Sequence, residues 1–220
     1  KINPNNICHL AIYGGYPSQN EDEKILKTNI NGTINLLSTL EGIDYDCFIN
    51  TGSSSEYGKK EFIMKETDIC EPNTVYGIAK LSSTLYCNHI SAKENKNIGT
   101  IRLFSVYGDY EEKGRLIPTL FINLLNGENV KLGNPAAVRD FVYIDDVVEA
   151  YISILNNPEK IKGKIFNISS GNQISIGEIS EKVKSILNSS CFLDFGNLSG
   201  RTFDSTTWLG DSSLFRETFN

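Results

Sequence analysis

Short apolar segments alternate with longer amphipathic segments along almost the whole 220-residue chain. Two of the apolar runs, Ile7–Ile12 and Tyr45–Asn50, are continuous enough to be strands buried on both faces of a sheet. Between them, 22–40 carries apolar residues at helical spacing. Strands and helices that alternate, with turn residues between them, are typical of a parallel sheet covered by helices. The sequence therefore predicts an α/β fold.

The same patterns predict the remaining elements. A helix capped by Asn73 or Thr74 should run to about residue 93, with Leu81, Leu85 and Ile90 facing the core. Further strands are expected at 100–104, 130–132, 139–143, 164–168 and 191–195, and further helices at 116–126, 144–155 and 176–187.

The charge and cysteine content exclude several classes of protein. Lys and Arg number 21 against 27 Asp and Glu, a net charge of −6, so neither nucleic acid nor an anionic membrane is expected as a partner. The five cysteines are scattered and never spaced as C-x-x-C, which favours reduced thiols in a cytoplasm. His9 and His89 lie in predicted regular elements without metal-ligand spacing, so both are interpreted as structural and no metal site is expected.

The chain is expected to be a fragment. Its only methionine is Met64, so the sequence has no initiator residue, and its last nine residues end within what looks like a helix.

Tyr76 and Lys80 form a Y-x-x-x-K pattern in the helix predicted after Pro72. This spacing puts both side chains on one face of the helix, one turn apart. An ammonium beside a phenol favours the phenolate, and a pKa lowered by roughly three units corresponds to about 4 kcal/mol. Such a tyrosine can exchange a proton with an alcohol or ketone at neutral pH. With ten tyrosines in the chain the pattern also arises by chance, and an ordinary surface pair is the alternative.

The segment Thr51–Gly58, TGSSSEYG, directly follows a predicted strand. Hydroxyl groups at the carboxyl end of a parallel strand lie where open α/β sheets bind their ligands. Ser53 could therefore hydrogen bond the same substrate oxygen as Tyr76. The alternative is a polar turn held together by local side-chain bonds.

Six motifs occur in order along the chain: HLA at 9–11, NINGT at 29–33, SSSEYG at 53–58, YGIAK at 76–80, IRLFSVYG at 101–108 and RDFVYIDDV at 139–147. Together they resemble the extended short-chain dehydrogenase/reductase family, the NAD-dependent epimerase/dehydratase enzymes that act on nucleotide sugars. The resemblance covers about residues 7–211.

That resemblance implies a Rossmann-type, doubly wound parallel sheet with a small C-terminal substrate-binding region. The Rossmann part would comprise 1–108 and 139–168, and the substrate-binding part 109–138 and 169–220. It also implies a homodimer formed through the helices around 29–40 and 76–90.

The resemblance assigns catalytic and cofactor roles to individual residues. Tyr76 would be the catalytic acid/base, Lys80 its pKa partner and a ligand of the nicotinamide ribose, and Ser53 the third catalytic hydroxyl. The cofactor would be NAD or NADP. Besides these three residues, it would contact Leu10, Ala11, Thr28 and Phe104.

The substrate implied is a nucleotide-diphosphate sugar, contacted by Ser54, Ser105, Arg139 and Arg201. Arginine suits the diphosphate because its planar fork binds phosphate oxygens bidentately. A salt bridge to a neighbouring aspartate is the alternative for Arg139, and a structural role is the alternative for Arg201, whose flanking motif is loose.

Three departures from the family pattern limit what the resemblance implies. The Gly-rich turn G-x-x-G-x-x-G is absent and HLA resembles the end of the fourth strand, so the first three strands are expected to be missing and the fragment to bind NAD poorly. Ser54 and Ser55 stand where dehydratases carry Asp-Glu, which disfavours dehydration. Ser105 stands where many members have Asn, which leaves the sugar open.

The expected chemistry is hydride transfer at a sugar ring carbon, usually C4, by an epimerase or a 4-keto-sugar reductase. A nucleotide-sugar dehydratase, or a non-catalytic homologue that binds NAD or a nucleotide, is the alternative. The nucleotide, the sugar and the choice between NAD and NADP stay open.

Overall fold

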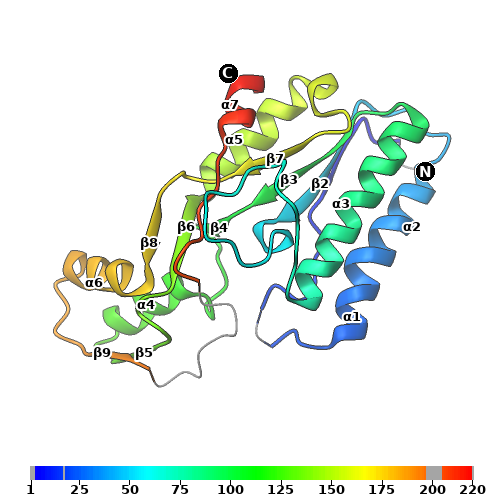
Figure 1. Cartoon of the computed structure of the whole chain (residues 1–220). Coiled ribbons are helices and arrows are strands. Elements are labelled where there is room, and N and C mark those ends of the chain that lie inside the picture. The colour runs from blue at the N-terminus through cyan, green and yellow to red at the C-terminus, as the bar shows by residue number, and fades with distance from the viewer. Residues whose placement is uncertain (1–2, 17, 197–204, 220) are drawn as a thin grey trace.

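A four-stranded parallel sheet forms the centre of the computed structural model, which describes residues 3–16, 18–196 and 205–219 (Figure 1). Its strands, in spatial order, are β1 (Asn6–His9), β2 (Cys47–Ser53), β3 (Ile98–Leu103) and β7 (Ile165–Ile168). Every neighbouring pair in this sheet is parallel. The α/β fold predicted from the alternation of apolar and amphipathic segments is confirmed.

Helices cover both faces of this sheet. Successive residues of a strand point to opposite faces, and here both faces carry apolar side chains that the helices bury. Phe48 and Ile98 pack on one face beneath a helical pair, whereas Ile49 and Ile101 pack on the other. The first face carries α1 (Asp22–Leu26), a π-helical turn (Lys27–Asn31), α2 (Gly32–Thr39) and α3 (Val75–Glu94). The second carries α5 (Ile144–Leu155), the short 3-10 turn that follows it (Pro158–Ile161) and the C-terminal α7 (Ser213–Phe219).

Helix α3 begins where predicted, but its buried face differs from the prediction. The Thr74 hydroxyl caps it by accepting the backbone N–H of Gly77 at 2.8 Å. Ile90 is buried, whereas Leu81 is only partly buried and Leu85 is 59% exposed, so the prediction for Leu85 was wrong. The buried face is made of small and polar residues: Gly77, Ala79, Lys80, Ser83, Thr84, Cys87 and Ser91.

These small side chains let the neighbouring helix approach closely. The Ser83 hydroxyl donates across the contact to the backbone carbonyl of Asn29 at 2.6 Å. Hydrophobicity alone therefore pointed to the wrong side of α3.

A smaller part of the molecule lies to one side of the main sheet, at the lower left of Figure 1. It contains a three-stranded sheet of β4 (Ser105–Tyr107), β6 (Val138–Tyr143) and β8 (Gln173–Ser175), and a parallel pair of β5 (Val130–Leu132) and β9 (Leu193–Phe195). Helices α4 (Leu116–Leu125) and α6 (Ile176–Ile186) pack on the pair and enclose a separate hydrophobic core. The chain then returns to the main sheet, where Phe215 and Phe219 of α7 pack against Phe166 of β7.

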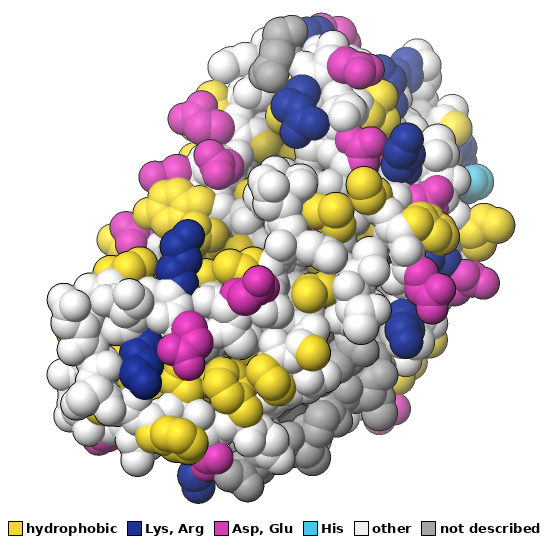
Figure 2. All heavy atoms as spheres, turned by 60° about the vertical axis from the view of Figure 1, so that its left-hand side comes forward, with side chains coloured by type: hydrophobic (Ala, Val, Ile, Leu, Met, Phe, Trp, Pro, Cys, Tyr) yellow, Lys and Arg dark blue, Asp and Glu magenta, His cyan; other side chains and the backbone are white. Residues whose placement is uncertain are grey.

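The surface mixes charges of both signs, and the face in Figure 2 shows basic and acidic side chains interspersed with small apolar areas. None of the described helices is both long enough and apolar enough to cross a membrane. All five cysteines are free thiols.

Candidate active site

A cavity of about 700 Å³ opens at the carboxyl ends of β1, β2 and β3. Ser53 is the last residue of β2 and leads into a single 3-10 turn (Ser54–Glu56), while Tyr76 and Lys80 lie in the first turns of α3. This is the edge at which open α/β sheets bind ligands. Eight of the residues singled out from the sequence line the cavity: Leu10, Ser53, Ser54, Tyr76, Lys80, Phe104, Ser105 and Arg139.

The Tyr76 phenol is partly buried in the cavity wall and interacts with the Ser53 side chain. Burial raises the pKa of Tyr76 to about 12, outweighing the lowering by the Ser53 hydrogen bond and by the positive charge of Arg115. The negative charge of Glu56 raises this pKa further. The sequence predicts a pKa lowered by Lys80; burial of the phenol opposes this lowering, which stays a prediction.

Lys80 is only 5% exposed, and its side chain borders the same cavity. Burial lowers the pKa of its ammonium, against the opposing effect of Glu56. Within the part of the chain that the structure describes, this ammonium has no hydrogen-bond or ion-pair partner. A buried cation normally acquires such partners. The site therefore offers up to three donors to a ligand that carries hydroxyl oxygens.

Ser53 is held from both its backbone and its side chain. Its backbone N–H donates to Glu56 Oε1 at 2.9 Å, and its hydroxyl accepts the backbone N–H of Ser55 at 3.1 Å. These reciprocal bonds form a capping box at the start of the 3-10 turn. The hydroxyl is therefore fixed at the end of β2 in a defined orientation.

Trp208 and Arg139 form a second part of the cavity wall. The Trp208 indole N–H donates to the Ser54 hydroxyl at 3.2 Å, and the Arg139 guanidinium lies 5.6 Å from the centre of the indole ring. A second cavity of about 260 Å³ adjoins the first and shares Ser105, Val106, Arg115 and Arg139 with it. Arg139 therefore stands where the two cavities meet.

Arg115 and Trp208 line the cavity and were not found from the sequence, whereas Glu56 belongs to the SSSEYG motif but was given no role there. Arg115 precedes α4, donates from Nη1 to the Gly15 carbonyl at 3.1 Å and lines both cavities. No motif marks Arg115 or Trp208, because each reaches the site only through the packing of distant segments.

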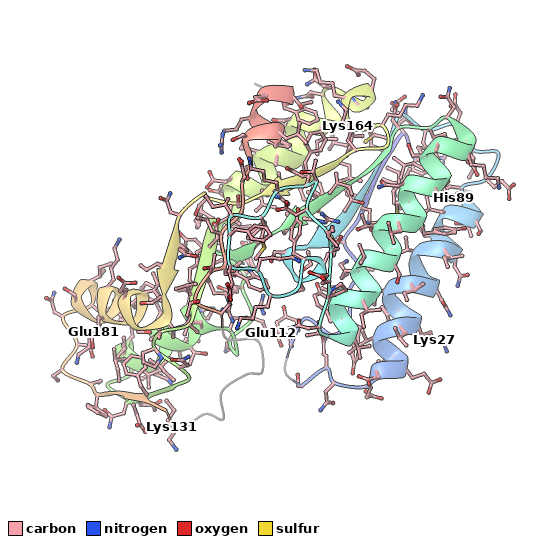
Figure 3. The ribbon with its side chains drawn as sticks, viewed as in Figure 1. Lys27, His89, Glu112, Lys131, Lys164 and Glu181 are labelled. Carbon is pink, nitrogen blue, oxygen red and sulfur yellow. The ribbon has the colours of Figure 1, made fainter. Side chains whose placement is uncertain are left out.

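Other predicted residues lie away from the cavity. Ala11 and Thr28 are not among the residues that line it, and Arg201 lies outside the described residues. His9 is buried and bonds the Thr33 hydroxyl at 2.9 Å. His89 is exposed on the outer side of α3, as Figure 3 shows.

Comparison with known proteins gives consistent results. The sequence profile of the NAD dependent epimerase/dehydratase family matches residues 1–169. An ADP-L-glycero-D-manno-heptose-6-epimerase of Brachyspira hyodysenteriae is 32% identical over 180 residues, which is 78% of this chain and 56% of that protein. A dTDP-4-dehydro-6-deoxyglucose reductase of Escherichia coli is 26% identical over 86% of this chain and 61% of its own length.

Among solved structures, the UDP-glucuronic acid 4-epimerase of Bacillus cereus, in complex with UDP-glucuronic acid and NAD, superposes with a TM-score of 0.90. It is 27% identical, and the match covers 98% of this chain and 69% of that one. The chain spans 56% to 64% of the length of three curated relatives that it matches.

Proposed function

This chain belongs to the NAD dependent epimerase/dehydratase family, and from that premise we propose that it provides the catalytic residues of an NAD(P)-dependent nucleotide-sugar epimerase or 4-keto-sugar reductase. One observation carries the proposal: Ser53, Tyr76 and Lys80 line a single cavity at the carboxyl edge of the sheet. The similar proteins named above include a nucleotide-sugar epimerase and a 4-keto-sugar reductase.

The side chains that line the cavity suit the nicotinamide riboside end of a dinucleotide such as NAD or NADP. Lys80, only 5% exposed, directs its ammonium into the cavity, and Leu10 and Phe104 supply apolar surface in the same lining. In the proposal Lys80 binds ribose hydroxyls of the cofactor, and Ala11 and Thr28 contact it outside the enclosed part of the cavity. When bound, the nicotinamide supplies or accepts the hydride.

The residues of this chain would then handle the proton. Ser53 steadies the reacting oxygen of the sugar, and Tyr76 exchanges a proton with the same oxygen through its phenol. With a pKa of about 12, the phenol is a proton donor at neutral pH, as reduction of a ketone requires. Oxidation of an alcohol requires the phenolate, and lowering the pKa by about five units corresponds to roughly 7 kcal/mol. Additional positive charge beside Tyr76 is therefore needed for the oxidative direction.

The part of the cavity wall formed by Trp208 and Arg139 suits the nucleotide sugar. In the proposal Arg139, and Arg201 with it, bind the diphosphate, while Ser54 and Ser105 contact the substrate. Segments 109–138 and 169–220 would form most of this substrate-binding part. Ser54 and Ser55 provide no carboxyl group for water elimination, so a dehydratase is disfavoured.

We further propose a homodimer through the helices around 29–40 and 76–90. Ile78 and Leu85 of α3 are 45% and 59% exposed. Burying such side chains against a second copy removes apolar surface from water.

The test uses the protein encoded by the complete reading frame. It is incubated with catalytic NAD, and separately with stoichiometric NADPH, against UDP-glucose, UDP-glucuronic acid and dTDP-4-dehydro-6-deoxyglucose. The absorbance of the reduced nicotinamide is followed. Stoichiometric loss of NADPH identifies a reductase, and interconversion of sugars without net loss identifies an epimerase.

The matched variants are Tyr76→Phe and, on the same helix but away from the cavity, Tyr86→Phe. An enzyme loses at least about a hundredfold in turnover with the first and little with the second, while nucleotide binding by calorimetry persists in both. Binding without turnover by the unsubstituted protein across the panel, or full turnover by Tyr76→Phe, would contradict the proposal.

A further inference from the structure

A fully buried ion pair lies directly beneath the end of β2. The Arg102 Nε atom is 2.8 Å from Glu56 Oε2, and the two side chains are only 3% and 0% exposed. Burying two charges carries a large desolvation penalty, so such a pair is weak grounds for expecting extra stability. Stability alone therefore does not explain why an ion pair is buried at this place.

The carboxylate of Glu56 links the ion pair to Ser53. While Oε2 binds Arg102, Oε1 accepts the backbone N–H of Ser53 at 2.9 Å. Gly52 makes room for this link, because a Cβ atom at that position would lie 2.5 Å from Oε1. The Glu56 carboxylate thus occupies the space that a side chain at position 52 would fill, next to Ser53.

The arginine is itself anchored across the sheet. Arg102 pairs with Gly52 in the register of β2 and β3, and its guanidinium lies 4.5 Å from the centre of the Tyr57 ring. The Tyr57 hydroxyl donates to the Asn167 side chain at 2.8 Å, and Asn167 is the β7 residue that pairs with Arg102. Glu56 is therefore held, directly or through Arg102 and Tyr57, by residues of three adjacent strands, β2, β3 and β7.

Capping alone does not account for this arrangement. The same chain has a second capping box, in which Ser175 and Glu178 begin the eleven-residue helix α6. That box is solvent-exposed, and Glu178 has no ion-pair partner within the described ranges. The buried box, by contrast, begins a turn of only three residues. Helix α6 is capped by Ser175 and Glu178 without a buried cation. The three-residue turn after Ser53 therefore does not need Arg102 in order to be capped.

We propose that Glu56, held by Arg102, is a positioning residue that fixes the backbone of Ser53, and thereby its hydroxyl, for proton transfer at Tyr76. This inference rests on the proposed function. Glu56 reaches the reacting groups only through Ser53 and through its charge. That charge also raises the pKa of both Tyr76 and Lys80.

The test replaces the pair in two ways. Glu56→Leu with Arg102→Met removes both charges and the link to Ser53, a kind of replacement that is often neutral for stability. Glu56→Gln with Arg102→Met also removes both charges but keeps an oxygen that can accept the Ser53 N–H. Glu178→Gln is the control, since it alters the exposed capping box only.

Two properties are measured: the hydrogen exchange of the Ser53 amide by NMR, and the kinetics with the nucleotide sugar identified in the panel. We expect the leucine variant to lose about a hundredfold in kcat with KM nearly unchanged, since misplacement of a reacting group costs about this much. Its Ser53 amide should exchange at least about tenfold faster, as expected for an amide that has lost its acceptor. The glutamine variant should recover most of both, and Glu178→Gln should match the wild type.

The proposal is overturned if the leucine variant folds and keeps wild-type kcat and wild-type protection of the Ser53 amide. If that variant does not fold, Glu56→Asp replaces it. The aspartate keeps the charge but is one methylene shorter and cannot reach both partners, so unchanged kcat there overturns the proposal equally. If the unsubstituted protein turns over no sugar, the proposed function fails, and the exchange of the Ser53 amide still decides whether Glu56 positions Ser53.

Discussion

Replacing Gly52 with alanine should destabilise the fold and disable the site together. The added Cβ would lie 2.5 Å from Glu56 Oε1 and 2.7 Å from Thr100 Cγ2, far inside the usual separation of about 3.5–4.0 Å. Both neighbours are fully buried, so neither can move into solvent. Overpacking of this kind destabilises by about 1–3 kcal/mol, and a displaced Glu56 loses a charged hydrogen bond to Ser53 or Arg102 worth about 1.5–3 kcal/mol. We expect a total near 3–5 kcal/mol.

Urea denaturation followed by far-UV circular dichroism measures this loss. Gly32→Ala is the matched control. Gly32 lies in helical backbone where the nearest atom to an added Cβ is the Lys27 carbonyl oxygen at 4.0 Å. Alanine there should stabilise by about 0.5–1 kcal/mol, because it has the higher helix propensity. A Gly52→Ala protein within about 1 kcal/mol of the wild type would refute the reasoning, since it would show that the Glu56 carboxylate does not need the space.

Three further outcomes are expected. Phe166→Ala should reduce the free energy of unfolding by about 3–5 kcal/mol in urea denaturation, because the ring is fully buried; a change below about 1 kcal/mol would contradict its place in the core. Burial lowers the pKa of His9, so the unfolded chain binds its proton more readily and stability should fall as the pH drops below about 6.5. His9→Gln should reduce the decrease in Tm between pH 7.5 and 5.5, which is roughly one unit either side of the ordinary histidine pKa. If Tm decreases as much in the variant as in the wild type, His9 is not the cause of the decrease. Trp208→Ala should raise KM for the nucleotide sugar about tenfold by removing both the donor to Ser54 and the ring beside Arg139. Trp208→Phe removes the same donor but keeps an aromatic ring, so its KM should rise less, and equal KM values in the wild type and both variants would contradict this.

The core elements of the fold could be predicted because burial leaves a periodic trace in the sequence. Helix α5 and strand β5 begin and end at the predicted residues, 144–155 and 130–132. Strands β4 and β8 were not predicted, since β4 follows β3 after a single residue and β8 runs directly into α6, so neither stands out as a separate apolar segment. Strand β2 extends to Ser53, three residues beyond the predicted end at Asn50, because its polar last residues still pair with β3.

The candidate site shows a similar division. Ser53, Tyr76 and Lys80 belong to motifs whose members lie close together along the chain, and the structure brings them into one cavity. Trp208 and Ser54 are separated by 154 positions, and Arg115 and the Gly15 carbonyl by 100. Contacts at such separations depend on the completed fold, so neither could be deduced from local pattern. The same holds for the burial of the Tyr76 phenol, which raises its pKa.

Two buried carboxylates, Glu56 and Asp140, hold different parts of the cavity wall in place. Changing one of them should therefore affect a different step from changing the other. Asp140 is fully buried on β6 beside Arg139 and accepts the backbone N–H groups of Ser170, Gly171 and Gly210 at 2.8, 3.2 and 3.1 Å. Gly210 follows Trp208 by two residues, so this carboxylate ties the segment that carries the indole to the strand that carries Arg139. Glu56 performs the corresponding task for Ser53 at the catalytic wall. A substitution of Asp140 should therefore raise KM for the nucleotide sugar, whereas a substitution of Glu56 should lower kcat by slowing proton transfer.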